Sequence, residues 1–144
     1  MKVAEIKVSY TSNLTEKIRL SNFKETYQFI LSHWDLNIIE YQEESKIILL
    51  NRSNMVLGIH QLSKGGISGT VVDLRIVLAI ALKCNASGII LVHNHPSGNL
   101  QPSEADRKIT RKLKEACDLL ELSLIDHLII SKQECFSFAQ EGIL

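Results

Sequence analysis

A continuous apolar run at residues 86–93, which overlaps the segment "SGIILVHNH", constrains the fold more than any other feature. A run of this length, next to a glycine and followed by the turn-forming letters "PSGN", is typical of a strand buried on both faces. Each face of such a strand has to be covered by another apolar layer. The run therefore predicts an interior strand of a sheet that carries helices on both sides.

Helical periodicity on both sides of this run supplies the covering layers. One helix is predicted from Thr70, as its N-cap, to Asn85, and another from Ser103 to Glu121. Both have apolar residues at three- and four-residue spacing. The predicted buried stripes are Leu74, Val77, Leu78, Ala81 and Leu82 in the first helix, and Ile109, Leu113, Ala116, Cys117 and Leu120 in the second.

The rest of the chain contributes a further helix and more strands. The segment "SNFKETYQFILSHW" has helical spacing, with Ser21 or Asn22 as its cap. Residues 45–51 and 55–62 are typical of a hairpin joined by "NRSN", and "LIDHLIIS" and "CFSFAQ" of late strands. Residues 3–10 alternate as an edge strand or an arm would. This order predicts a mixed α/β sheet between helices.

Composition places limits on function. The 144 residues, 45% hydrophobic and 22% charged, suit one globular domain. Sixteen basic and sixteen acidic residues give a formal net charge of zero. Nucleic-acid affinity depends on phosphate contacts, so this balance does not support nucleic-acid binding. The basic run at residues 107–114 falls on a predicted helix and is interpreted as a solvated face.

The cysteines and the N-terminus bear on location. Cys84, Cys117 and Cys135 are widely spaced and odd in number, which indicates reduced thiols. The N-terminus lacks an apolar signal core, and no apolar run approaches the length of a membrane span. We therefore expect a cytoplasmic protein with no membrane association.

The apolar run ends in His93 and His95, the most informative residues for function. Alternate residues of a strand point to the same side, so both imidazoles project together at its carboxyl end. Asp106, in the first turn of the next helix, is the candidate third ligand. Two histidines and a carboxylate suit Zn²⁺, with a fourth position left for water. Ser103-x-x-Asp106 is also a helix capping box, which is compatible with this interpretation.

The residues His93, His95, Ser103 and Asp106, in this spacing, are similar to the JAMM signature of JAB/MPN-type zinc metalloproteases. The segments "HNHPSGNLQPSEADRKITRKLKEA", "DHLIIS" and "SFAQEGIL" resemble the bacterial RadC family in particular, from about Glu43 to the C-terminus. The chain is similar to the short RadC relatives, which lack the N-terminal helix-hairpin-helix region.

The resemblance implies a fold and a division of the chain. The implied fold is a cytidine-deaminase-like α/β/α sandwich with a mixed sheet. Residues 1–40 would form an N-terminal arm and helix, and residues 41–144 the RadC-like JAB/MPN domain, within one compact unit.

The resemblance also implies a mechanism of zinc-dependent hydrolysis. In the family a catalytic glutamate precedes the first core strand, and counting back from Asn51 places it at Glu43, with Glu44 and Glu40 as alternatives. Neighbours in a strand point to opposite sides, so only one of Glu43 and Glu44 can face the metal. Ser103 would donate a hydrogen bond to the tetrahedral intermediate. The bond cut would be a peptide or isopeptide amide of an unknown peptide or protein substrate.

A second class of function is a non-catalytic or weakly active metal-containing module in DNA repair or mobile-element biology, because RadC proteins carry a DNA-repair label. The neutral charge balance argues against tight DNA binding. His127, in "DHLII", is expected to be structural, near Asp126.

Overall fold

The computed structural model describes residues 1–13, 16–65 and 71–144. Over these ranges the chain forms three helices and five strands. In chain order they are α1 (Phe23–Leu31), β1 (Glu44–Leu50), β2 (Val56–Lys64), α2 (Leu74–Lys83), β3 (Gly88–Asn94), α3 (Glu104–Leu119), β4 (Ser123–Ile130) and β5 (Cys135–Ser137).

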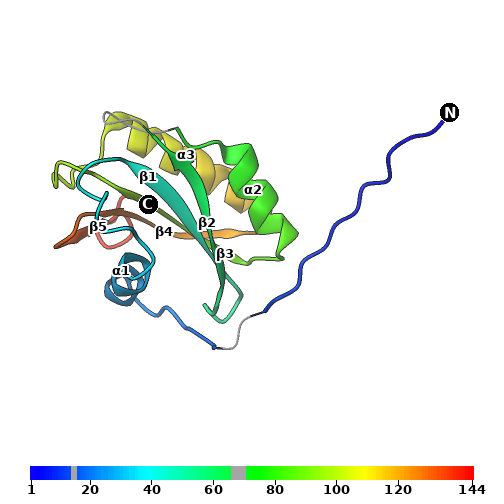
Figure 1. Cartoon of the computed structure of the whole chain (residues 1–144), viewed down its shortest axis with the longest axis horizontal. Helices are drawn as coiled ribbons and strands as arrows, with labels where there is room; N and C mark the ends of the chain where they lie inside the picture. The colour runs from blue at the N-terminus through cyan, green and yellow to red at the C-terminus, as the bar shows by residue number, and fades with distance from the viewer. Residues whose placement is uncertain (14–15, 66–70) are drawn as a thin grey trace.

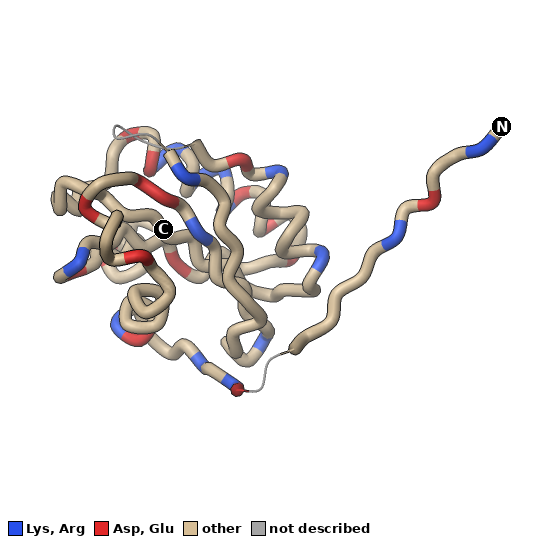
Figure 2. Tube along the Cα trace, in the orientation of Figure 1, with Lys and Arg blue, Asp and Glu red and all other residues tan. Residues whose placement is uncertain are grey.

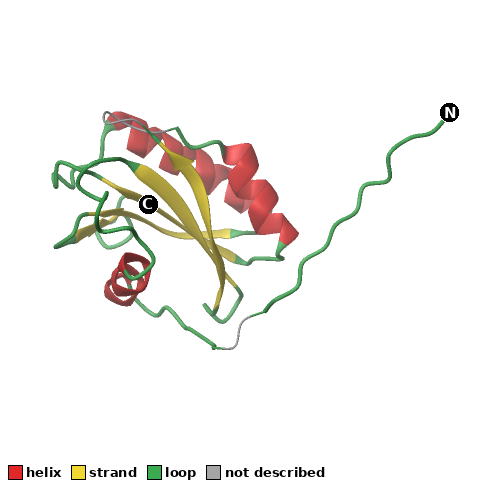
Figure 3. Cartoon of the chain, in the orientation of Figure 1, coloured by secondary structure: helices red, strands yellow, loops and turns green. Residues whose placement is uncertain are grey.

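The strands form one mixed sheet in the order β2-β1-β3-β4-β5. The β3–β4 pair is parallel, and the other neighbouring pairs are antiparallel. Every residue of β3 is buried, which confirms the predicted interior strand. Figure 1 and Figure 3 show α1 on one face of the sheet and α2 with α3 on the other. The predicted α/β fold with helices on both faces is confirmed.

Strand alternation divides the apolar residues into two layers, one on each face of the sheet. The layer under α1 includes Tyr27, Ile30, Trp34, Ile48, Leu50, Ile90, Val92, Leu128 and Ile130. The layer under α2 and α3 includes Ile47, Leu49, Val77, Ala81, Ile89, Leu91, Leu113, Cys117 and Leu124. The central strands thus supply both layers, as the continuous apolar run predicted.

Local signals set the ends of the first helix and of the hairpin. Of the two predicted caps of α1, Asn22 is the one observed, and its side chain accepts the N–H of Glu25 at 2.9 Å. In the β1–β2 turn the Asn51 side chain accepts the N–H groups of Ser53 and Met55, at 2.9 Å and 3.0 Å. These are local hydrogen bonds, which is why the sequence could indicate them.

Two details of the helix predicted from Thr70 to Asn85 are wrong. The helix predicted from Thr70 is Leu74–Lys83, with Asp73 as its N-cap, and Thr70 itself lies outside the described residues. Leu82 is 49% exposed, because the buried line of α2 runs through Val77 and Ala81 and the next residue is turned about 100° away.

The second helix also ends differently from its prediction. α3 ends at Leu119, and Leu120 is its exposed C-cap rather than a member of the buried stripe. Leu113 and Cys117, also in that predicted stripe, are fully buried.

The N-terminal residues and the charged residues lie at the surface. Residues 3–10 form no strand and project from the body of the protein as an exposed arm (Figure 1). Figure 2 shows residues of both signs interspersed along the chain. Among the described residues, no helix is long and apolar enough to cross a membrane. Cys84, Cys117 and Cys135 are free thiols.

A pair of leucines on α3 tests the packing of the layers. Leu113→Ala should lower the free energy of unfolding by about 2–5 kcal/mol, because its fully buried side chain leaves a cavity. Leu119→Ala should change it by less than about 0.5 kcal/mol, because this side chain is 83% exposed. Urea denaturation measures both. Equal losses in the two variants would contradict the packing of α3 described above.

Candidate metal centre

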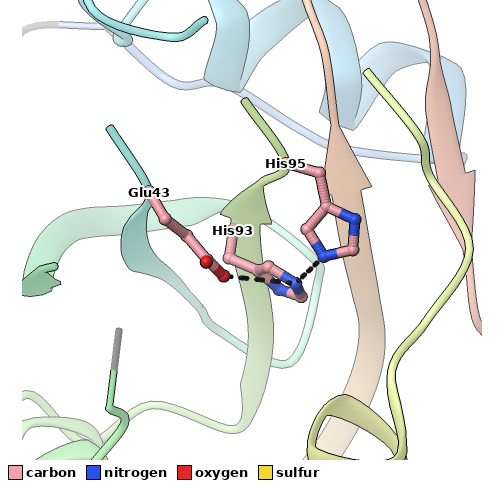
Figure 4. A group of neighbouring side chains, drawn as sticks. All are labelled: Glu43, His93 and His95. Carbon is pink, nitrogen blue, oxygen red and sulfur yellow. Dashed lines mark hydrogen bonds and ion pairs between the residues drawn. The ribbon is translucent and has the colours of Figure 1, made fainter. Parts of the chain in front are cut away.

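The carboxyl end of β3 brings two imidazoles together. His93 and His95 point to the same side, and their Nε2 atoms lie 3.0 Å apart. Figure 4 shows both rings beside the carboxylate of Glu43, whose Oε1 lies 3.9 Å from His93 Nε2. One ligand atom from each of these three residues lies within 4.8 Å of the others, so this group can hold a metal ion.

Asp106 reaches the same two imidazoles from the first turn of α3. Its Oδ1 lies 3.3 Å from His93 Nε2, and its Oδ2 lies 3.3 Å from His95 Nε2. The parallel β3–α3–β4 crossover explains the approach, because the N-terminus of α3 follows the carboxyl end of β3 after a short loop.

A capping box fixes the carboxylate of Asp106. Ser103 Oγ accepts the Asp106 N–H at 3.0 Å, and Asp106 Oδ2 accepts the Ser103 N–H at 2.8 Å. The two functions suggested by the sequence therefore coexist in one residue, which closes the helix end and faces both histidines. Ser103 itself is exposed at the helix end.

Strand register decides which glutamate lies at the histidines. Ser45 of β1 is paired with His93 of β3, and continuing this antiparallel register by two residues brings Glu43 to His95. Glu44 faces the opposite side, where its Oε1 accepts a hydrogen bond from Gln61 Nε2 at 3.1 Å. Of the candidates considered, Glu43 is therefore the one beside the imidazoles.

The third candidate, Glu40, lies away from this group. It is exposed, and its Oε1 lies 3.3 Å from Lys132 Nζ. The catalytic role assigned to Glu43 remains a prediction, because position alone does not establish proton transfer.

Asn94, between the two histidines, points to the opposite face and holds the segment that carries Glu43. Its Nδ2 donates to the carbonyls of Ile39 and Gln42 at 2.7 Å and 2.9 Å. Its Oδ1 accepts the N–H of Glu44 at 2.7 Å. No role of Asn94 was predicted from the sequence. The available signal was its position, since a residue between two same-facing histidines has to point the other way.

The loop after β3 sets the orientation of His95. Its Nδ1 lies 2.6 Å from the carbonyl oxygen of Asn99, and a carbonyl only accepts, so Nδ1 carries the proton. In the neutral ring the Nε2 lone pair therefore faces the group. Gly98, at φ +82°, lets the loop fold back in this way, and its N–H donates to the carbonyl of His95 at 2.9 Å.

His127 lies next to Asp126, and its ring contacts His93. Asp126 accepts the backbone N–H of His127 at 2.7 Å and is not the partner of the ring. The buried ring stacks on Phe138 at 4.5 Å, and its Nε2 lies 2.8 Å from His93 Nδ1. Its Nδ1 lies 2.6 Å from Thr110 Oγ1.

Burial and charge shift the pKa values of the group. Burial raises the pKa of Glu43, and His93 and His95 oppose part of that rise. Burial also acts to raise the pKa of Asp106, but the contacts of its carboxylate with His93 and His95 outweigh burial and hold that pKa far below its usual range. Burial lowers the pKa of His127 well below its usual value, and the nearby His93 adds to this effect. Asp106 therefore stays ionised.

The chemistry of the donor set fits a cation. The Asp106 oxygens, Glu43 Oε1 and the His95 Nε2 lone pair converge, and atoms that only accept need a positive charge between them. Ligand atoms of a tetrahedral ion with bonds of about 2.0–2.1 Å stand roughly 3.3 Å apart. Both contacts between Asp106 and the histidines have this separation.

Comparison with known proteins agrees with the geometry. A family model described as "RadC-like JAB domain" matches residues 20–143, most of the chain. The chain belongs to this family. The resemblance to RadC that the sequence indicated is therefore confirmed for this RadC-like domain.

Curated relatives of the RadC-like domain are named UPF0758 proteins. One from Flavobacterium johnsoniae is 52% identical over 101 residues, which cover 70% of this chain and 44% of the relative. One from Porphyromonas gingivalis is 46% identical over 104 residues, covering 72% and 46%. One from Pelodictyon phaeoclathratiforme is 33% identical over 138 residues, covering 96% and 60%. The alignments thus span about half the length of these relatives.

An Asn94→Ala substitution tests the support of the Glu43 segment. We expect the free energy of unfolding to fall by at least about 1–3 kcal/mol, because buried backbone groups lose their partners. Amide hydrogen exchange at Glu44 should also accelerate, since its N–H donates to Asn94. Asn37→Ala, at an exposed site, is the control. Unchanged exchange at Glu44 would show that Asn94 does not hold this segment.

Proposed function

We propose that the RadC-like domain is a Zn²⁺-dependent hydrolase of the JAMM type that cleaves a peptide or isopeptide amide. The observation that carries this proposal is the convergence of His93, His95 and Asp106, with the carboxylate of Glu43 beside them. Membership of the RadC-like JAB family supports it.

His93, His95 and Asp106 would hold the ion. Two imidazoles and one carboxylate are a donor set typical of catalytic zinc sites. When bound, Zn²⁺ supplies Lewis acidity that polarises a carbonyl and lowers the pKa of a water molecule to about 7. Glu43 is the more distant carboxylate, 3.9 Å from His93 Nε2, against 3.3 Å for Asp106. We therefore assign Asp106 to the ligand set and leave Glu43 for proton transfer.

Glu43 would move the proton during hydrolysis. Its carboxylate accepts a proton from the attacking water and returns it to the leaving nitrogen of the amide. Burial raises the pKa of Glu43, which brings this carboxyl closer to the pH at which it can both accept and donate. The bond between the carbonyl carbon and the nitrogen breaks, and the amine leaves with the transferred proton.

Ser103 would bind the oxygen of the reacting carbonyl. Its Oγ accepts the Asp106 N–H, and this arrangement keeps its hydroxyl proton for another acceptor. The N-terminus of α3 also favours negative charge developing near it.

A cavity beside the group can receive the substrate. It has a volume of about 230 Å³, with Glu43, His93 and Asp106 among its lining residues. Its apolar lining consists of Val71, Val72, Leu91, Ala105 and Ile109. We propose that a peptide or protein substrate places its amide at the polar residues and an apolar side chain against the others.

The free thiols suit a reducing, cytoplasmic setting.

Metal analysis of purified protein tests the ligand set. Wild-type protein should carry about one zinc per chain, and Asp106→Ala and the His93→Ala/His95→Ala double variant should lose it. His60→Ala removes a histidine of β2 that belongs neither to the group nor to the lining of its cavity, and should leave the zinc content unchanged. Full zinc content in the double variant would reject the assignment.

A Glu43→Gln variant tests the base. It should keep its zinc but lose amide hydrolysis by roughly 10²–10⁴-fold, because glutamine cannot accept the proton. Glu40→Gln, which changes an exposed glutamate, is the matched control. A Glu43→Gln protein with undiminished turnover would remove Glu43 from the mechanism. One that kept every biological activity would favour a non-catalytic module in DNA repair or mobile-element biology.

A further inference from the structure

We propose that Thr110 and His127 are positioning residues that fix the tautomer of His93, so that its Nε2 lone pair faces Asp106 and His95. The inference rests on the proposed function in one respect, that His93 is a metal ligand. It concerns a buried chain of hydrogen bonds from α3 through β4 to β3, which neither the motif nor the family comparison assigns.

This chain of hydrogen bonds starts at the hydroxyl of Thr110, which has two partners. Thr110 Oγ1 lies 2.7 Å from the carbonyl oxygen of Asp106 and 2.6 Å from His127 Nδ1. A carbonyl oxygen only accepts, so the single hydroxyl proton of Thr110 is donated to Asp106. Thr110 Oγ1 can then only accept from His127. His127 Nδ1 therefore carries a proton.

The tautomer of His127 determines that of His93. A neutral imidazole carries one proton, so His127 Nε2 is an acceptor once Nδ1 is the donor. His127 Nε2 lies 2.8 Å from His93 Nδ1, which therefore donates to it. The remaining nitrogen, His93 Nε2, keeps its lone pair. This atom lies 3.0 Å from His95 Nε2 and 3.3 Å from Asp106 Oδ1.

The surroundings of His127 keep this ring neutral and fixed. Its side chain is fully buried and stacks on Phe138 with the ring planes 7° apart. No carboxylate contact of the ring is found among the described residues. A charged ring would cost free energy in this setting. It would also donate from Nε2 and force His93 into the tautomer whose Nε2 carries a proton.

The two histidines thus reach the same tautomer by different means. His95 donates from Nδ1 to the carbonyl of Asn99, in the loop that follows β3. His93 donates from Nδ1 into the buried chain that ends at Thr110. Thr110 lies one helical turn after Asp106. The helix α3 therefore supplies both the Asp106 carboxylate and the Thr110 hydroxyl, which sets the tautomer of His93 facing that carboxylate.

The test compares Thr110→Val with Thr110→Ser. Valine keeps the shape of the side chain but leaves His127 Nδ1 without an acceptor. The His127 proton can then move to Nε2, which reverses the direction of the hydrogen bond between His127 and His93. Serine keeps the hydroxyl. We expect Thr110→Val to weaken Zn²⁺ affinity by about 10–100-fold, measured against a chromophoric chelator, and Thr110→Ser to stay near wild type.

A control on α1 separates this effect from the loss of a helix hydroxyl. Thr26 is buried and donates to the carbonyl of Asn22 at 2.9 Å, the same type of contact as that of Thr110 with Asp106. Thr26→Val should leave Zn²⁺ affinity unchanged. At β4, His127→Gln retains an acceptor for His93 Nδ1 and should bind Zn²⁺ more tightly than His127→Leu.

A second measurement reads the tautomers without any metal. The ¹⁵N shifts of the imidazoles in zinc-free protein should show protons on Nδ1 of His93 and His127 in the wild type, and a shift toward Nε2 in Thr110→Val. Unchanged ring shifts together with wild-type Zn²⁺ affinity in Thr110→Val would overturn the proposal. If wild-type protein binds Zn²⁺ but cleaves no amide, the proposed hydrolase fails while affinity still tests this inference. If it binds no Zn²⁺, the shifts alone decide.

Discussion

Burial of β3 on both faces is the constraint on which the rest of the structure depends. Its apolar residues alternate between two layers, so α1 has to cover one face and α2 with α3 the other. Because β3 and β4 are parallel, the chain crosses over between them through α3. The crossover places the N-terminus of α3 at the carboxyl end of β3. The same arrangement that buries the strand brings His93 and His95 to Asp106.

The first turns of α3 combine several functions through ordinary helix hydrogen bonds. Ser103 and Asp106 cap the helix reciprocally, and this bond also orients the carboxylate toward the imidazoles. Thr110 bonds to the carbonyl of Asp106 and accepts from His127. Stability of the helix end and orientation of the proposed ligands are therefore coupled, because the same atoms serve both.

Strand alternation performs a similar division within three consecutive residues. His93 and His95 face the group, while Asn94, between them, faces the segment that carries Glu43. The side-chain oxygen and nitrogen of Asn94 form hydrogen bonds with backbone groups that would otherwise be buried without partners. One short segment of strand thus presents the imidazoles on one side, and through Asn94 on the other side it holds the backbone next to Glu43.

The sequence by itself determined the features that local periodicity and spacing encode. These were the interior strand, helices on both faces, the capping box at Ser103 and the histidine pair on one side of the strand. Tertiary structure alone decided which side chains meet across the sheet. The β1–β3 register brought Glu43, rather than Glu44 or Glu40, to the histidines, and the β3–β4 pairing placed His127 against His93. Such contacts join residues far apart in the chain, and their geometry depends on strand pairing and helix packing that no local pattern records.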